Sequence, residues 1–126
     1  MIIDSNSQIL VVDDSGAVRS IVRKIMTQLG CTDVDEASDG TAALAKMNEK
    51  LYGLVISDWI MEPMNGKALL DHVRGKKTLE KIPFIMMTTE SEQYKILEAR
   101  YAAVSFISKP FSAEGLQAII SKIDVK

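Results

Sequence analysis

The sequence lacks the features that mark secreted and membrane proteins. It has one cysteine, Cys31, which excludes an intramolecular disulfide and any metal site built from several cysteines. No apolar run exceeds about four residues, whereas a membrane-spanning helix needs about 18. Residues 1–7 have neither the basic start nor the apolar stretch of a signal peptide. We therefore expect no membrane partner and a cytoplasmic location.

Charge of neither sign dominates the chain. Its 15 lysines and arginines face 17 aspartates and glutamates, which gives a net charge of −2 at pH 7. No basic block is long enough to form a nucleic-acid-binding arm, so we expect no nucleic-acid partner. Hydrophobic residues make up 47% of the chain, as is ordinary for a globular protein. The length predicts that residues 1–126 form a single domain with one core.

Short apolar runs alternate with segments of helical periodicity. Between Ser15 and Leu29 the apolar residues recur on one face of a helix, which Ser15 can cap and Gly30 can end. Such alternation is typical of an α/β fold with a parallel sheet. We expect strands at residues 9–12, 33–37, 54–57, 84–87 and 104–108, and helices at residues 15–29, from 39, after 65, near 91–101 and from 112.

The polarity of the predicted strands indicates their order. The first, third and fourth strands are almost wholly apolar, so they should lie in the centre with both faces covered. The second has only Val34 and Ala37 as clear core residues, and the fifth is mixed, so both should lie at the edges. With right-handed crossovers this favours a doubly wound, five-stranded parallel sheet of order 2-1-3-4-5, with five helices on its two faces.

Polar residues stand where four of the predicted strands end. They are Asp13 and Asp14 after the first strand, Asp58 after the third, Thr88 after the fourth and Lys109 after the fifth. The carboxyl ends of parallel strands lie at one edge of a sheet, and ligands bind there where the strand order reverses. That point lies between the first and third strands. We therefore expect these carboxylates, the hydroxyl and the ammonium to share one cleft.

Such a cleft suits a divalent cation and a phosphoryl group. Three neighbouring carboxylates repel one another, and a hard cation such as Mg²⁺, which prefers oxygen ligands, removes that conflict. The expected ligands are Asp13, Asp14, Asp58 and the backbone carbonyl of Ile60. An aspartate can also attack phosphorus, so Asp58 is the expected phosphoryl acceptor.

Lys109 and Thr88 suit the charge on a phosphoryl group. Phosphoryl transfer depends on positioning and on spreading charge over the equatorial oxygens. The Lys109 ammonium can neutralise one oxygen, and the Thr88 hydroxyl can donate to another. No histidine is needed, and the only one, His72, falls on a predicted helix away from these strand ends.

These strand ends resemble the receiver domain of two-component response regulators. The resemblance covers residues 8–123, and its motifs are Val11-Val12-Asp13-Asp14-Ser15, Ile56-Ser57-Asp58-Trp59, Met86-Met87-Thr88 and Lys109-Pro110-Phe111. The segments 55–59 and 64–66, together with the expected absence of an output domain, make the chain most similar to the stand-alone chemotaxis members of that family.

The resemblance implies a phospho-acceptor protein rather than an enzyme with a separate substrate. Asp58 would accept a phosphoryl group from a histidine kinase. Asp13 and Asp14 would hold Mg²⁺, and Lys109 would bind a phosphoryl oxygen. The protein would catalyse only its own phosphorylation and dephosphorylation.

The resemblance also implies a switch and its partners. Thr88 would move toward the phosphoryl group while the Phe106 ring turns inward, and the surface of the fourth helix, fifth strand and fifth helix would change its affinity for a target. The implied partners of this monomer are a CheA-like histidine kinase, a target such as the flagellar motor switch, and a phosphatase. A phosphate sink or phosphorelay shuttle is the nearest alternative.

The chain departs from the family pattern beside the site. Ile60, Thr89 and Glu90 occupy positions that tune dephosphorylation in the family, and an apolar Ile60 would shield the acyl phosphate from water. Pro63 lies one place later than the usual proline, so the loop would differ in shape. Phe106 lacks the hydroxyl of the tyrosine in chemotaxis members, which makes a partner contact through that hydroxyl unavailable.

Two other classes share part of this pattern. A flavodoxin-like electron carrier has the same topology, but Asp13 and Asp14 would repel a flavin phosphate. A phosphatase with an aspartate nucleophile usually has a second aspartate two residues on, where this chain has Ile60.

The basic residues of the predicted helix 15–29 have a less specific interpretation. Arg19, Arg23 and Lys24 could dock an acidic partner. A solvated face is the simpler interpretation, because the charged side of an amphipathic helix usually faces water.

Overall fold

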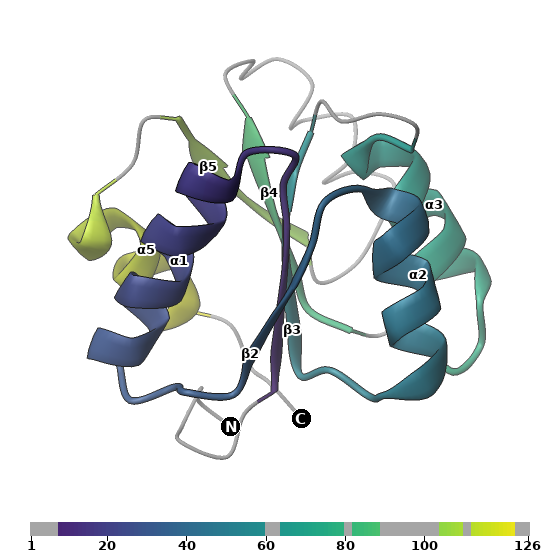
Figure 1. Cartoon of the computed structure of the whole chain (residues 1–126), viewed down its shortest axis with the longest axis horizontal. Coiled ribbons are helices and arrows are strands. Elements are labelled where there is room, and N and C mark those ends of the chain that lie inside the picture. Colours follow the sequence, from purple (N-terminus) through teal and green to yellow (C-terminus); the bar gives the residue numbers. More distant parts are fainter. Residues whose placement is uncertain (1–7, 60–63, 80–81, 89–103, 110–111, 123–126) are drawn as a thin grey trace.

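A parallel five-stranded sheet forms the centre of the fold (Figure 1). The computed structural model describes residues 8–59, 64–79, 82–88, 104–109 and 112–122. The strand order is β2-β1-β3-β4-β5 and every neighbouring pair is parallel, as predicted. The strands are β1 (Ile9–Val12), β2 (Val34–Ala37), β3 (Leu54–Asp58), β4 (Phe84–Thr88) and β5 (Val104–Ser108).

Helices cover both faces of this sheet. α1 (Gly16–Gln28) and α5 (Ala113–Ile120) lie on one face, and α2 (Gly40–Glu49) and α3 (Gly66–Gly75) lie on the other (Figure 1). The predicted doubly wound α/β architecture is therefore confirmed. The helix expected near residues 91–101 lies outside the described residues. Within the described ranges, none of the helices combines the length and the apolar character that crossing a bilayer requires.

Side-chain caps determine where the four helices begin. The residue before each helix accepts a hydrogen bond from the N–H three residues further on, and these residues are Ser15, Asp39, Asn65 and Ser112. Each cap satisfies an N–H group that the helix cannot pair internally. The cap predicted at Ser15 is thus confirmed, and the helices expected from residues 39 and 112 begin directly after these two residues. Gly30 has a φ of 91°, a left-handed conformation that favours glycine after a helix.

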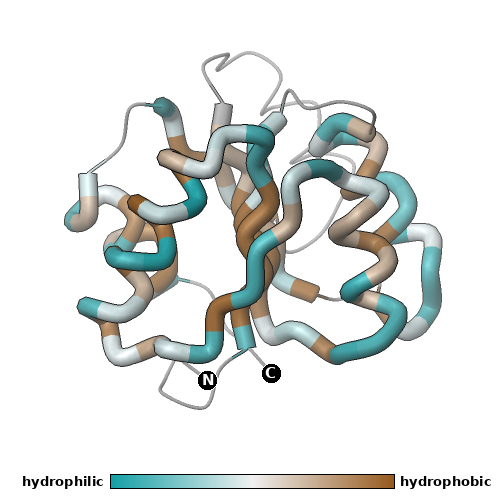
Figure 2. The backbone as a smooth tube through the Cα atoms, in the orientation of Figure 1, coloured by the Kyte–Doolittle hydropathy of each residue, from teal (hydrophilic) through white to brown (hydrophobic). Residues whose placement is uncertain are grey.

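Two apolar layers hold the helices on the sheet. Leu10 and Val12 of β1 belong to the layer beneath α2 and α3, whereas Ile9 and Val11 belong to the layer beneath α1 and α5. β1 and β3 are buried throughout, and β2 has two half-buried positions in its middle. Figure 2 shows the hydrophobic residues concentrated along the central strands. The central and edge positions predicted from strand polarity are therefore correct.

β3 and β4 each extend one residue beyond the predicted strand. Asp58 is the last residue of β3, and Thr88 is the last residue of β4. The backbone of Asp58 is paired in register with that of Met87. Strand pairing, rather than a loop, therefore determines where the Asp58 side chain leaves the sheet.

A polar network links β2 to the segment between α2 and β3. The Lys50 ammonium lies 3.2 Å from Asp33 Oδ1 and 3.1 Å from Asp35 Oδ2. The Tyr52 hydroxyl donates to Asp35 Oδ2 at 2.6 Å, while its ring is buried. The hydrogen bond from Tyr52 is the main cause that lowers the pKa of Asp35, with Lys50 adding to it and burial opposing it. This network attaches the edge strand to the core.

We expect Tyr52→Phe to lower the free energy of unfolding at pH 7 by about 1 kcal/mol, because it removes a hydrogen bond to a carboxylate and keeps the buried ring. The pKa of Asp35 is lowered by folding, so its contribution to stability is present at neutral pH and is lost as the pH falls through the acid range. The difference between variant and wild type should therefore shrink on acidification, which denaturant unfolding at several pH values would measure.

Asp33→Asn is the control for this experiment. It removes only a partly exposed contact with Lys50 and should cost about 0.3 kcal/mol. A Tyr52→Phe difference that stays constant from neutral to acid pH would contradict the role assigned to Asp35.

Candidate functional site

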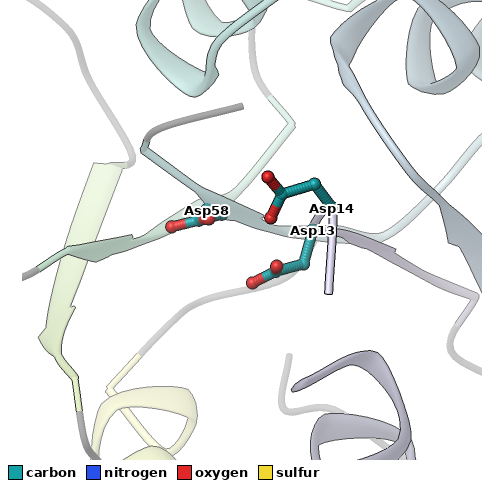
Figure 3. Close-up of side chains that lie close together, drawn as sticks. All are labelled: Asp13, Asp14 and Asp58. Atoms are coloured by element: carbon teal, nitrogen blue, oxygen red, sulfur yellow. The ribbon is translucent and has the colours of Figure 1, made fainter. Parts of the chain in front are cut away.

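Three carboxylates meet at the carboxyl edge of the sheet (Figure 3). Asp13 follows β1 and Asp58 ends β3, and the pairing of Val12 with Ser57 makes the next residues on the two strands neighbours. Asp14 approaches them from the turn between β1 and α1. One oxygen of each carboxylate lies within 4.8 Å of the others. The structure therefore brings together the three carboxylates that the sequence predicted at one edge.

Asp13 is the most restrained of the three. It is fully buried, its Oδ1 accepts from the Ser15 N–H at 2.8 Å, and its Oδ2 accepts from Lys109 at 3.1 Å. Asp58 is 8% exposed, and Asp14 is exposed. The cluster therefore has two carboxylates inside the protein and one that faces solvent.

Among the described residues, Lys109 is the cation that contacts the carboxylates of this cluster. It follows β5, and its Nζ lies 3.1 Å from Asp13 Oδ2 and 3.1 Å from Asp58 Oδ1. In the sheet, β4 lies between β5 and β3, so the long lysine side chain reaches past the end of one strand. One ammonium thus bridges two carboxylates from different strands.

The pKa shifts follow from burial and from these contacts. Burial raises the pKa of Asp13, and the nearby Asp58 charge adds to this, while hydrogen bonds from Ser15 and Lys109 oppose it. Burial alone would lower the pKa of the Lys109 ammonium. Its hydrogen bonds to Asp13 and Asp58 outweigh burial, so the pKa of Lys109 is raised. Lys109 therefore stays charged at neutral pH and offsets part of the repulsion between the carboxylates.

The remaining charge fits a divalent cation. With the three carboxylates ionised and one ammonium beside them, the cluster has an excess of two negative charges. All of its ligand atoms are hard oxygen donors, and Asp14 opens the cluster to solvent. Mg²⁺ binds such donors while it keeps several waters. The acidic cluster can therefore hold a metal ion of this kind.

Two further predicted site residues lie in the described part of the chain. Thr88 ends β4, one residue beyond Met87, which is paired with Asp58. Phe106 lies in β5 opposite Met86 and packs, partly buried, on the apolar layer beneath α2 and α3. Ile60, Thr89 and Glu90 lie outside the described residues.

The chain around Asp58 approaches the neighbouring helices closely. The Gly66 N–H donates to the Trp59 carbonyl at 2.9 Å, and the Gly40 N–H donates to the Met64 carbonyl at 3.0 Å. A Cβ atom at Gly66 would lie 2.1 Å from the Asp58 carbonyl oxygen, and one at Gly40 would lie 2.7 Å from Met64 Cγ. The starts of α2 and α3 therefore have space only for glycine.

Arg19 is a neighbour of the site that the sequence did not identify. Its Nη1 donates to the Asp13 carbonyl at 2.6 Å, and its Nε donates to Glu36 Oε1 at 3.0 Å. Arg23 also binds Glu36, at 2.9 Å, whereas Lys24 is exposed as expected. The prediction of a solvated face is therefore wrong for Arg19. The available signal was a pair of arginines four residues apart on one helix face, next to a strand that carries a glutamate.

Comparison with known proteins agrees with this fold and site. The response regulator receiver domain family matches residues 9–121. The chain is 37% identical over 123 residues to chemotaxis protein CheY-3 of Vibrio cholerae, which covers 97% of this chain and 95% of that protein. It is 38% identical over 117 residues to chemotaxis protein CheY of Pseudomonas aeruginosa, and the alignment covers 92% of this chain and 94% of that protein. A solved structure of Vibrio cholerae CheY4 matches with a TM-score of 0.85 and 31% identity, over 94% of this chain and 98% of that one.

The chain belongs to the response regulator receiver domain family. Within this family it is similar to the CheY chemotaxis proteins, so the resemblance predicted from the strand-end motifs is confirmed. Members of this family are phospho-acceptor signalling proteins rather than conventional enzymes. The cluster of Asp13, Asp14 and Asp58 is consistent with a phospho-acceptor site. Membership of this family argues against the flavodoxin-like carrier and the aspartate phosphatase.

We expect Gly66→Ala to lower the free energy of unfolding by about 2 kcal/mol, because the added methyl group would overlap the Asp58 carbonyl, which strand pairing holds in place. Urea unfolding would measure the loss. Gly75→Ala is the control at the other end of α3, where an added Cβ has no neighbour within 4 Å. It should match the wild type or exceed it by up to about 1 kcal/mol, since alanine favours the helix. Wild-type stability in Gly66→Ala would contradict the close approach of α3 to β3.

Proposed function

We propose that the protein is a phosphorylation switch in which Asp58 accepts a phosphoryl group from the phosphohistidine of a histidine kinase. The arrangement around Asp58 carries this proposal. Its carboxylate lies 3.1 Å from the Lys109 ammonium, and an oxygen of it lies within 4.8 Å of oxygens of Asp13 and Asp14. Membership of the receiver domain family supports a histidine kinase as the donor.

The proposed reaction replaces a P–N bond by a P–O bond. A carboxylate oxygen of Asp58 attacks phosphorus, and the electron pair of the broken bond returns to the imidazole nitrogen of the kinase. The Lys109 ammonium neutralises charge on one phosphoryl oxygen, and the Thr88 hydroxyl donates to another. Attack of water on phosphorus later releases phosphate and restores the Asp58 carboxylate.

We propose that Asp13, Asp14 and Asp58 hold Mg²⁺ together with the backbone carbonyl of Ile60. When bound, the ion would neutralise charge on a phosphoryl oxygen. The hydrogen bond from the Ser15 N–H keeps the Asp13 carboxylate in place. The exposed Asp14 can contact the ion directly or through water.

Thr88 and Phe106 are the proposed switch residues. They belong to the adjacent strands β4 and β5, and Phe106 is only partly buried. A phosphoryl group that attracts Thr88 would free space into which the Phe106 ring turns. The surface formed by β5, α5 and the helix expected near residues 91–101 would then change its affinity for a protein target. Thr89 and Glu90, together with Ile60, would tune the dephosphorylation rate.

The proposed pathway is chemotaxis, because the similar proteins are chemotaxis proteins. Its partners would be a CheA-like kinase, the flagellar motor switch and a phosphatase, and the protein would act in the cytoplasm as a monomeric single domain. Phe106 favours an alternative role outside motor control, since it lacks a hydroxyl through which a motor protein could be bound. A phosphate sink or a phosphorelay shuttle would not need that contact.

We expect incubation with an active histidine kinase and Mg²⁺ to give a hydroxylamine-sensitive adduct at Asp58, detected by intact-mass measurement and peptide mapping. Asp58→Asn should abolish the adduct, because an amide is a poor nucleophile. Asp71→Asn, which changes an aspartate paired with Lys67 on α3, should be phosphorylated like the wild type. An adduct that persists in Asp58→Asn would refute Asp58 as the acceptor.

We expect Ile60→Asn to shorten the lifetime of the acyl phosphate by about tenfold, which corresponds to about 1.4 kcal/mol in activation free energy. The proposed reason is that the apolar side chain shields the acyl phosphate from attacking water. Ile60→Val keeps an apolar side chain and should preserve the lifetime. The measurement is the decay of phosphorylated protein after removal of the donor, and equal decay in Ile60→Asn and wild type would contradict this role.

A further inference from the structure

Arg19 joins two segments that border the acidic site. Its Nη1 donates to the carbonyl oxygen of Asp13 at 2.6 Å, and its Nε donates to Glu36 Oε1 in β2 at 3.0 Å. The Arg19 side chain is only 22% exposed, so both bonds are partly shielded from water. One guanidinium thus connects the turn after β1 to the edge strand of the sheet.

Both the N–H and the carbonyl of Asp13 are linked to β2, the first directly and the second through Arg19. Its N–H donates to the Ala37 carbonyl at 3.1 Å, and its carbonyl is held by Arg19, which Glu36 anchors. Because the peptide unit is planar, a fixed Asp13 carbonyl also fixes the positions of the Asp14 nitrogen and Cα. Arg19 therefore determines where the side chain of Asp14 starts.

This restraint opposes the repulsion within the cluster. Asp13 and Asp58 are buried, and an oxygen of Asp14 lies within 4.8 Å of theirs. Repulsion between such charges favours movement of the turn away from the sheet. The rigid guanidinium resists this movement, since one of its donors is bonded to the turn and another to the strand.

The positive charge of Arg19 would have the opposite effect on a bound cation. A cationic side chain near a cation site weakens binding through Coulomb repulsion. If Arg19 acted only through its charge, its removal would tighten the binding of a divalent cation. If it acts by holding the turn, its removal would weaken that binding. The sign of the change therefore separates the two effects.

We propose that Arg19 is a positioning residue, which holds the Asp13–Asp14 peptide so that both carboxylates can bind the same divalent cation. The proposal rests on the proposed function, in which the acidic cluster holds Mg²⁺. Arg19 is bonded to the Asp13 carbonyl rather than to a carboxylate of the cluster, so it would act through the backbone that carries the ligands. Groups that orient metal ligands typically change metal affinity by about 10- to 100-fold when they are removed.

Arg23 provides a matched control on the same helix. Its Nε lies 2.9 Å and its Nη2 2.8 Å from Glu36 Oε2. Among the described residues, its guanidinium is bonded to Glu36 and not to the turn of Asp13 and Asp14. Arg19→Met and Arg23→Met therefore each remove one positive charge and one ion pair with Glu36. Only Arg19→Met also releases the Asp13 carbonyl.

The test is a Mg²⁺ titration of the full chain followed by the fluorescence of Trp59, the single tryptophan, which adjoins Asp58. The rise in the free energy of unfolding with Mg²⁺ concentration gives the same affinity independently. Arg19→Met should raise the dissociation constant by about tenfold. Arg19→Lys should also raise it, because one ammonium cannot reproduce the two separated donors. Arg23→Met should stay within about twofold of the wild type.

Mg²⁺ binding as tight as in the wild type, or tighter, in Arg19→Met or Arg19→Lys would overturn the proposal. Equal weakening in Arg19→Met and Arg23→Met would also overturn it, since the effect would then belong to Glu36 or to helix stability. If Arg19→Met does not fold, Arg19→Lys, which keeps the charge and most of the stem, decides. A wild-type protein that neither binds Mg²⁺ nor forms the Asp58 adduct would refute the proposed function itself, and the inference with it.

Discussion

The site depends on the contact between the Lys109 ammonium and two buried carboxylates. Asp13 and Asp58 come from adjacent strands, and burial of two like charges is unfavourable without a cation beside them. Lys109 lies 3.1 Å from each and comes from β5, at the far edge of the sheet from β2. The strand order thus brings the carboxylates of Asp13 and Asp58 together, and it also brings the Lys109 ammonium close enough to offset their repulsion.

Much of this arrangement could be predicted because its causes are local in the sequence. β1, β3 and β4 are almost wholly apolar up to their last residues, as strands covered on both faces must be, and this predicted their central positions. Ser15, Asp39 and Ser112 predicted helix starts, since their side chains can accept from the first free N–H groups. Once the parallel topology was inferred, the approach of Asp13 to Asp58 followed from their places at the strand ends.

Contacts that depend on packing could not be predicted in this way. The two arginines of α1 offered a signal for pairing with Glu36, but no local pattern indicates that the Asp13 carbonyl also lies beside Arg19. The closeness of Gly66 to the Asp58 carbonyl also results from the packing of α3 against β3. The lengths of β3 and β4 likewise depend on partners that are distant in the sequence.

The place of β5 at the edge of the sheet affects how the protein opens locally. An edge strand detaches more readily than a central one, because only one of its sides is paired. When β5 detaches, Lys109 leaves with it, and the buried Asp13 carboxylate loses its counter-ion. The hydrogen bonds that break lie between β4 and β5, but detachment also has an electrostatic cost at Asp13, which follows β1. The ion pair between Lys109 and the buried Asp13 carboxylate therefore protects the amide protons of β5 against exchange with solvent.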